Sequence, residues 1–140
     1  MTASRPREGA KVFVDAKIVG RHDKDAPKRT VVGFVVPGRQ DFDSARFLEA
    51  DETDDAELHA VYFAIQQLKD KLTEFTIICD HDSVVSMIDR GSPKMVRKRP
   101  ILSKILGEKE KHPGIEVVVL EKNPAHKFLN KWYAEHMSSR

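Results

Sequence analysis

The sequence predicts an α/β fold, a mixed five-stranded sheet with three antiparallel strands and then two parallel ones, flanked by helices. Three short runs rich in β-branched and aromatic residues come first, separated by polar turns, as is typical of an antiparallel meander. The hydrophobic period then changes to that of helices, and two later strands each follow a helix. Strands that follow helices usually pair in parallel, so the order β-β-β-α-β-α-α-β-α predicts a mixed sheet.

The first three strands are bounded by turn signals. Lys11–Ile18 is predicted as the first strand, and the polar segment Gly20–Lys28 follows it. Thr30–Val36 is predicted as the second strand, because Pro37-Gly38 stops its apolar run. A weaker run predicts the third strand at Ser44–Glu49. The polar connections favour antiparallel pairing between these neighbours.

The rest of the chain alternates helices with strands. Apolar residues recur at helical spacing from Asp54 to about Lys71, which predicts the first helix. Asn123 and Pro124 are typical of the N-cap and first position of a last helix. Between these two helices the sequence predicts a strand at Phe75–Asp80, a helix at Asp82–Ile88 with Asp82 as its N-cap, a helix at Pro100–Lys111 and a strand at Ile115–Leu120.

The composition favours one globular domain. The chain has 140 residues, of which 40% are hydrophobic and 33% charged, and no apolar run approaches the roughly 20 residues that span a bilayer. We expect residues 1–10 to be a disordered lead-in that lacks the apolar stretch of a signal peptide, and residues 11–140 to form a single domain. Cys79 is the one cysteine and lies in a predicted buried strand, which fits a reducing cytoplasm and argues against a thiol metal site.

The charges are unevenly distributed, although the formal net charge is only +2. Acidic residues crowd into Glu49–Asp55, and basic residues crowd into Lys94–Pro100. A local basic cluster can contact phosphates even in a chain that is nearly neutral. The basic segment is predicted as a loop between two helices, and it is either a solvated loop or a contact for nucleic acid.

Three acidic residues lie where strands end or a helix begins, namely Asp15, Glu57 and Asp80. A carboxylate at the end of a buried strand is costly unless a cation meets it. Three that converge favour a hard divalent cation such as Mg²⁺, which prefers oxygen ligands. Structural alternatives exist, since Glu57 could complete a capping box with Asp54 and Asp80 could cap the helix after it. Asp15 has no easy structural role inside an apolar strand.

The order of the elements and three motifs along it resemble the ribonuclease H-like family. The match runs from about Lys11 to Met137. The motifs are Val12–Asp15 on the first strand, Ala56–Ile65 on the first helix, and Ile77–Asp80 followed by Val84, Val85 and Ile88. Each motif is weak alone, and together in this order they are fairly specific.

The resemblance to type 1 ribonuclease H implies a metal-dependent endonuclease that cuts the RNA strand of RNA–DNA hybrids. It implies that Asp15, Glu57 and Asp80 bind Mg²⁺ or Mn²⁺, with Asp15 bridging two ions that activate water and stabilise the leaving oxygen. In the family an Asp usually opens the last helix. His126 is similar to it in place, as a peripheral ligand or an aid to product release, and Glu135 competes from further along the helix.

The chain departs from the family pattern after two of its acids. Ala16-Lys17 follows Asp15, where the family has Gly-Ser and a glycine-rich turn. His81-Asp82 follows Asp80, where the family has Ser-Gln or similar. These changes argue against the family's preference for RNA–DNA hybrids more than they argue against metal binding.

The resemblance also implies where nucleic acid is held, since the family's region between these helices can grip the duplex backbone. Contacts to phosphates are expected from Lys94, Arg97, Lys98 and Arg99, and Lys17 is a further candidate. Because these contacts are electrostatic, binding should weaken steeply with salt.

Two other classes of function remain open. The altered first turn and His126 favour a nucleic-acid- or partner-binding domain with little catalysis. The intact acidic set favours the enzyme, because a lapsed site has no reason to keep three acids that repel one another. An exonuclease or a junction resolvase on the same fold is the third possibility. A resolvase should be a dimer, whereas the hybrid nuclease should be a monomer.

Overall fold

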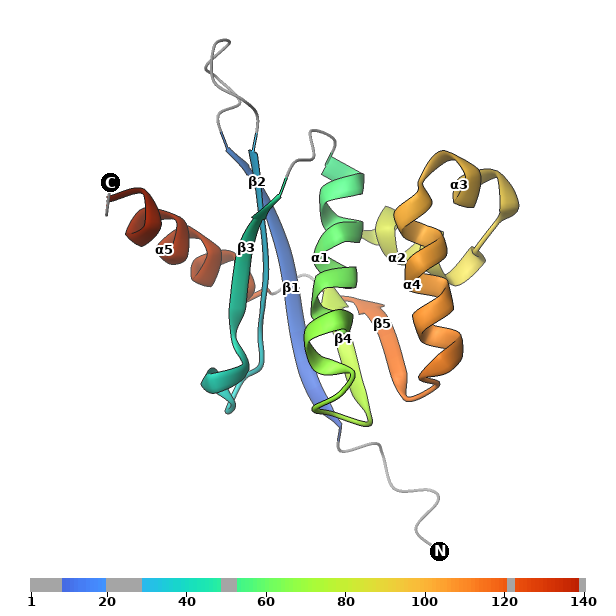
Figure 1. The fold of residues 1–140 in the computed structure, drawn as a ribbon, viewed down its shortest axis with the longest axis horizontal. Coiled ribbons are helices and arrows are strands. Elements are labelled where there is room, and N and C mark those ends of the chain that lie inside the picture. The colour runs from blue at the N-terminus through green and yellow to red at the C-terminus, as the bar shows by residue number, and fades with distance from the viewer. Residues whose placement is uncertain (1–8, 20–28, 49–52, 121–122, 139–140) are drawn as a thin grey trace, which may run out of the picture.

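The computed structural model of the chain describes residues 9–19, 29–48, 53–120 and 123–138 (Figure 1). These residues contain strands β1 (Ala10–Val19), β2 (Arg29–Val35), β3 (Ser44–Leu48), β4 (Phe75–Cys79) and β5 (Ile115–Val119), and helices α1 (Thr53–Leu68), α2 (Asp82–Arg90), α3 (Pro93–Lys98), α4 (Pro100–Lys111) and α5 (Ala125–Ser138). A short 3-10 helix, η2, spans Gln40–Phe42. Every strand and helix that the sequence predicts is present, with bounds that differ by a few residues.

Some predicted segments lie outside the described residues. These are most of the lead-in, the polar segment Gly20–Lys28 and part of the acidic run that begins at Glu49. Ala10, which the sequence places in the lead-in, belongs to β1 and pairs with Phe75. No helix in the described part of the chain is long and apolar enough to cross a membrane.

The strands form a five-stranded sheet, within the described residues, in the order β3-β2-β1-β4-β5. β2 pairs antiparallel with both β1 and β3. β4 runs parallel to both β1 and β5. The predicted mixed sheet is therefore confirmed, because the strands that follow helices are the parallel ones.

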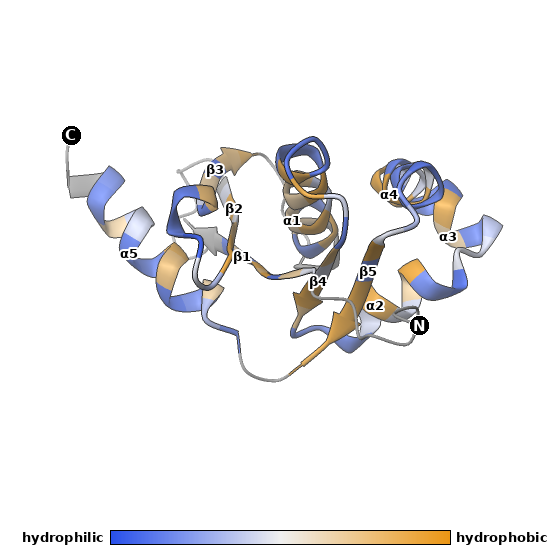
Figure 2. Cartoon of the chain, turned by 90° about the horizontal axis from the view of Figure 1, so that it is seen from below, coloured by the Kyte–Doolittle hydropathy of each residue, from blue (hydrophilic) through white to orange (hydrophobic). Residues whose placement is uncertain are grey.

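Helices cover both faces of the sheet, and the first three strands lie between α1 and α5 (Figures 1 and 2). α1 packs on β1 and β2 with α4 beside it, and α5 packs on the same two strands from the other side. The apolar core under α1 includes Val12, Val14, Leu58, Ile65, Ile77 and Leu102. Because side chains alternate along a strand, β1 turns Val14 toward α1 and Asp15 toward α5.

β1 and β4 separate before β1 ends. They pair from Ala10 with Phe75 to Phe13 with Ile78, whereas β1 continues to pair with β2 up to Val19. In open α/β sheets, ligands bind at the carboxyl ends of strands where neighbouring strands part. Two of the candidate acids, on β1 and after β4, come just past this point.

The prediction of a loop for the basic segment is wrong over most of its length, because Pro93–Lys98 forms α3. The Oγ of Ser92 accepts a hydrogen bond from the backbone N–H of Met95 at 3.3 Å, and Pro93 follows it at the start of the helix. Ser-Pro is a helix-start signal, but a helix of 6 residues is too short to show a hydrophobic period. Arg99 is extended because it precedes Pro100, and this extended residue separates α3 from α4.

Candidate metal centre

Three acidic side chains from three elements meet where β1 and β4 separate. Asp15 lies within β1, Glu57 near the start of α1 and Asp80 directly after β4. Asp15 and Glu57 are buried, with 4% and 1% of their surface exposed, whereas the side chain of Asp80 is 31% exposed. The structure thus brings the three predicted acids together, with two of them shielded from water.

Burial and like charge keep a proton on this cluster. Burial is the largest cause that raises the pKa of Glu57 from 4.5 to about 9, followed by the charges of Asp15 and Asp80 and a hydrogen bond with Asp15. Burial also raises the pKa of Asp15, although its hydrogen bond with His126 opposes this. Without a metal ion, Glu57 therefore stays protonated at neutral pH and donates a hydrogen bond to Asp15.

The predicted capping box pairs Glu57 with Asp54, whose side chain lies outside the described residues. The contacts that the Glu57 carboxyl makes run toward the acidic cluster. Asp80 likewise faces a neighbouring imidazole in the cluster rather than the backbone of α2. Both carboxyl groups are thus available to a cation bound in the cluster.

His126 lies beside Asp15, at the start of α5. Its Nδ1 is 3.1 Å from the Oδ2 of Asp15, and its side chain is 66% exposed. Glu135, the competing candidate, is nine residues further along the same helix, which is about 13 Å along the axis. The residue on α5 that meets the acidic cluster is therefore His126.

Asn123 fixes the start of α5 against β1. Its Nδ2 donates a hydrogen bond of 2.7 Å to the carbonyl of Val14, the residue before Asp15. Its Oδ1 accepts a hydrogen bond of 3.0 Å from the backbone N–H of Ala125, as the predicted cap should. One side chain thus ties the turn before α5 to the strand that carries Asp15.

Gly33 lets α5 approach the sheet at the same place. It is the β2 residue that pairs with Asp15, so the two residues share a face of the sheet. A Cβ added at Gly33 would lie 2.6 Å from the Cδ2 of Leu129 and 2.8 Å from the carbonyl oxygen of Ser44. Real Cβ contacts are essentially never this short, so a larger residue here would force the side chain of Leu129 and the backbone of β3 at Ser44 to shift.

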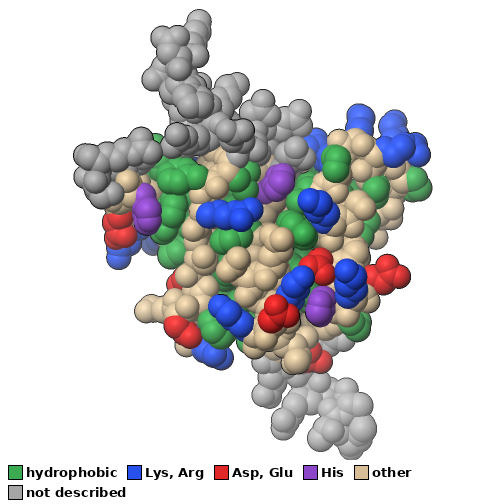
Figure 3. All heavy atoms as spheres, in the orientation of Figure 1, with side chains coloured by type: hydrophobic (Ala, Val, Ile, Leu, Met, Phe, Trp, Pro, Cys, Tyr) green, Lys and Arg blue, Asp and Glu red, His purple; other side chains and the backbone are tan. Residues whose placement is uncertain are grey.

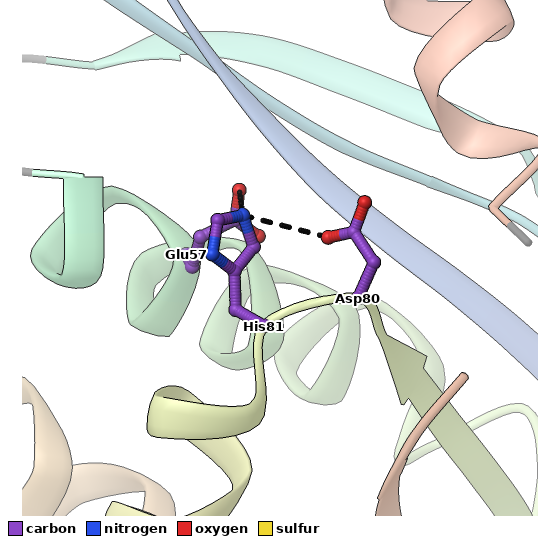
Figure 4. A group of neighbouring side chains, drawn as sticks. All are labelled: Glu57, Asp80 and His81. Carbon is purple, nitrogen blue, oxygen red and sulfur yellow. Dashed lines mark ion pairs between the residues drawn. The ribbon is translucent and has the colours of Figure 1, made fainter. Parts of the chain in front are cut away.

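His81 belongs to the cluster, although the sequence did not single it out. Its Nε2 lies 3.3 Å from the Oε1 of Glu57 and 3.5 Å from the Oδ1 of Asp80 (Figure 4). One ligand atom from each of these three residues lies within 4.8 Å of the others. The available signal was an Asp-His pair at the end of a buried strand.

The prediction of Asp82 as N-cap of α2 is wrong, because His81 is the N-cap and its side chain makes no capping hydrogen bond.

Cys79 lies next to Glu57 on the buried side of the cluster. Its thiol is 3.9 Å from the Oε2 of Glu57 and donates to it. Burial, followed by the nearby carboxylates, raises the pKa of the thiol to about 12. The predicted burial of Cys79 is confirmed, and the thiol is protonated and unreactive at neutral pH.

The predicted phosphate contacts fall into two places. Lys94, Arg97 and Lys98 are exposed on α3, where Lys and Arg side chains gather (Figure 3), and Arg99 is half-buried behind them. Lys17 lies elsewhere, on the same face of β1 as the first acid of the cluster.

Lys17 is held at the seam between β1 and α5. Its Nζ donates a hydrogen bond of 2.7 Å to the Oδ1 of Asn130 and lies 6.0 Å from the ring centroid of Tyr133. A positive charge therefore lies on the seam between β1 and α5, on the face of β1 that also carries Asp15.

The comparisons with known proteins identify the fold. No protein-family profile and no curated protein sequence matches the chain. LC11-RNase H1 in complex with an RNA/DNA hybrid matches with a TM-score of 0.63 at 19% identity, over 83% of this chain and 89% of that one. The foamy viral protease-reverse transcriptase in complex with dsDNA matches with a TM-score of 0.62 at 16% identity, over 80% and 81%.

A third solved structure, RNase H1 from the halophilic archaeon Halobacterium salinarum NRC-1, matches with a TM-score of 0.55 at 12% identity, over 81% and 86% of the two chains. The strand order and the mixed pairing of the sheet agree with these matches. The chain therefore has the ribonuclease H fold, as the motifs on its first strand, first helix and fourth strand implied.

Proposed function

We propose that this chain is a metal-dependent endonuclease that hydrolyses the RNA strand of RNA–DNA hybrids. The observation that carries this proposal is the convergence of Asp15, Glu57 and Asp80 where two strands of the sheet part. A buried group of acids is costly unless a cation neutralises it, which favours a metal site. One solved neighbour is an RNase H1 bound to an RNA/DNA hybrid, which supports this substrate.

The donor set fits divalent cations. Carboxylate oxygens suit Mg²⁺ and Mn²⁺, and Asp15, Glu57 and Asp80 would hold them. Two such ions would activate a water molecule and stabilise the leaving oxygen of a phosphodiester. In this proposal Asp15 would serve both ions, and Glu57 would give up its proton in order to bind them. His126, held by Asp15 and largely in solvent, moves a proton to or from the departing product.

The basic residues hold the duplex in this proposal. Lys94, Arg97, Lys98 and Arg99 contact phosphates from α3 and its end, and Lys17 contacts them beside the cluster. Phosphate contacts supply affinity without reading sequence, so the enzyme cuts hybrids of any sequence. It acts as a monomer, with a single domain over residues 11–140.

The test is cleavage of a labelled RNA–DNA hybrid with Mg²⁺ or Mn²⁺, alongside duplex RNA, duplex DNA and single strands. We expect cleavage of the RNA strand of the hybrid, lost in Asp15→Asn by at least about a thousandfold, since the carboxylate that bridges the ions is gone. Asp70→Asn is the matched control, because Asp70 is exposed in the turn that follows α1, whereas Glu57 lies near the start of that helix. Full activity in Asp15→Asn would refute the proposal.

A binding domain with little catalysis is the second candidate. It is favoured by Lys17, which follows Asp15 where the resemblance implies a glycine-rich turn. The side chain of Lys17 lies instead between β1 and α5, where it donates a hydrogen bond to Asn130. In that case the folded protein would bind the hybrid in a salt-dependent way and cut none of the substrates. An exonuclease would instead give products trimmed from an end. A junction resolvase would have a dimeric mass and would cleave a four-way junction.

A further inference from the structure

The imidazole of His81 faces two of the acids that the proposed function assigns to metal binding (Figure 4). We propose that His81 is a metal ligand together with Glu57 and Asp80, and that it makes this position prefer a first-row transition-metal cation, Mn²⁺, over Mg²⁺. This inference rests on the proposed function, because it concerns the metal selectivity of the same site.

The spacing of the three side chains suits one cation. The Nε2 of His81 is 3.3 Å from an oxygen of Glu57 and 3.5 Å from an oxygen of Asp80. Neighbouring ligands of an octahedral ion with bonds of about 2.1 Å lie about 3 Å apart. The two contacts of His81 are close to this spacing, and the three ligand atoms lie within 4.8 Å of one another.

The backbone holds His81 in this orientation. Its N–H donates a hydrogen bond to the Sγ of Cys79 at 3.4 Å, and its carbonyl accepts one from the N–H of Val85 at 3.3 Å. His81 is the N-cap of α2, but its side chain makes no capping hydrogen bond. The ring is thus placed by the turn between β4 and α2, on the acids and away from the helix.

The chemistry of the ligand decides the metal. Mg²⁺ is a hard cation that takes oxygen ligands and keeps several waters, so an imidazole adds little to its binding. Mn²⁺ accepts carboxylates and binds a nitrogen donor more readily, as first-row transition metals do. A site with two carboxylates and an imidazole therefore gains affinity for Mn²⁺ and little for Mg²⁺.

His126 supplies a matched control on the same cluster. It contacts Asp15 at 3.1 Å and is 66% exposed, so it lies at the edge of the cluster and outside the group of Glu57, Asp80 and His81. His81→Ala and His126→Ala each remove one imidazole ring that contacts acids of the cluster. Only the removal of His81 should change the selectivity between the two metals.

A different role for His81 makes the opposite prediction. The ring could instead occupy the site through its contacts with Glu57 and Asp80 until a metal ion displaces it. Removing the ring would then strengthen the binding of both metals equally, because nothing would compete with them.

The experiment measures metal binding to the whole chain without nucleic acid. Mn²⁺ is titrated by electron paramagnetic resonance, and Mg²⁺ by its competition with Mn²⁺, for the wild type, His81→Ala and His126→Ala. We expect His81→Ala to weaken Mn²⁺ binding by about tenfold or more and Mg²⁺ binding by less than about threefold. His126→Ala should leave the ratio of the two affinities within about twofold of the wild type.

A second readout detects the ligand itself and does not depend on a variant's stability. Protein labelled with ¹⁵N-histidine and loaded with Mn²⁺ should show ¹⁵N coupling in pulsed electron paramagnetic resonance, and this coupling should persist in His126→Ala. Absence of the coupling, or equal or tighter binding in His81→Ala, overturns the inference while leaving the proposed nuclease intact. If the wild type binds neither metal, the proposed metal-dependent function fails and this inference fails with it.

Discussion

Replacing Glu57 with Gln should stabilise the metal-free protein at neutral pH and change its stability little in acid. In the folded protein the pKa of Glu57 is about 9, whereas the ordinary value is 4.5. Between these values only the folded state holds the proton, so the unfolding free energy falls by about 1.4 kcal/mol for each unit that pH rises. Gln resembles the protonated acid and does not titrate. At about pH 7 the variant should therefore be more stable by about 3 kcal/mol.

The assay is urea denaturation of both proteins with a metal chelator, at several values from about pH 5 to about pH 8. The advantage of Glu57→Gln should grow by about 1.4 kcal/mol per pH unit over this range. Glu110→Gln is the matched control, because Glu110 is exposed on α4, and its difference from the wild type should not depend on pH. A difference for Glu57→Gln that is constant with pH would show that Glu57 is not held protonated, and the reasoning would be refuted.

Three further predictions follow from the docking of α5 and from the basic helix. Gly33→Ala should destabilise the protein by about 1–3 kcal/mol in urea denaturation, because its Cβ would collide with the backbone of β3 at Ser44 and with Leu129 of α5. Gly107→Ala is the control, since a Cβ there meets nothing within 4 Å in a helix and should add up to about 1 kcal/mol of stability. Asn123→Ala should lose about 1 kcal/mol and should speed amide hydrogen exchange in α5, whereas unchanged exchange would contradict its role as a tether. Replacing the three exposed basic residues of α3 with Gln should flatten the dependence of log Kd on log salt by about 2–3 units, and an unchanged slope would exclude α3 from the interface.

Much of this fold could be predicted because its signals are local. The strands show β-branched runs that end at Pro-Gly or polar turns, and α1 shows an apolar stripe with a period of a helix. The acids could be found for the same reason, since Asp15 interrupts an apolar strand and Asp80 ends one. The sequence order of strands and helices then determined which strands pair in parallel.

What the sequence did not reveal depends on contacts between distant residues. The ring of His81 turns to Glu57 because of where α1 and β4 lie, and no local pattern reports this direction. Gly33 interrupts an apolar strand, but the atoms that leave no room for a side chain there belong to Ser44 on β3 and Leu129 on the last helix. The helix α3 was missed for a different reason, because Ser92 and Pro93 are a helix start that precedes too few residues to show a period.

His81 and His126 contact the acidic cluster across chain segments of very different length. This difference predicts the order in which the cluster assembles. Glu57 and His81 are 24 positions apart in the chain, whereas Asp15 and His126 are 111 apart. Closing the longer loop costs about 1.4 kcal/mol more in chain entropy. α5 packs on β1 and β2, so it can detach while α1, β4 and α2 stay together. The group of Glu57, Asp80 and His81 should therefore persist in partly unfolded states in which the pair of Asp15 and His126 has already come apart.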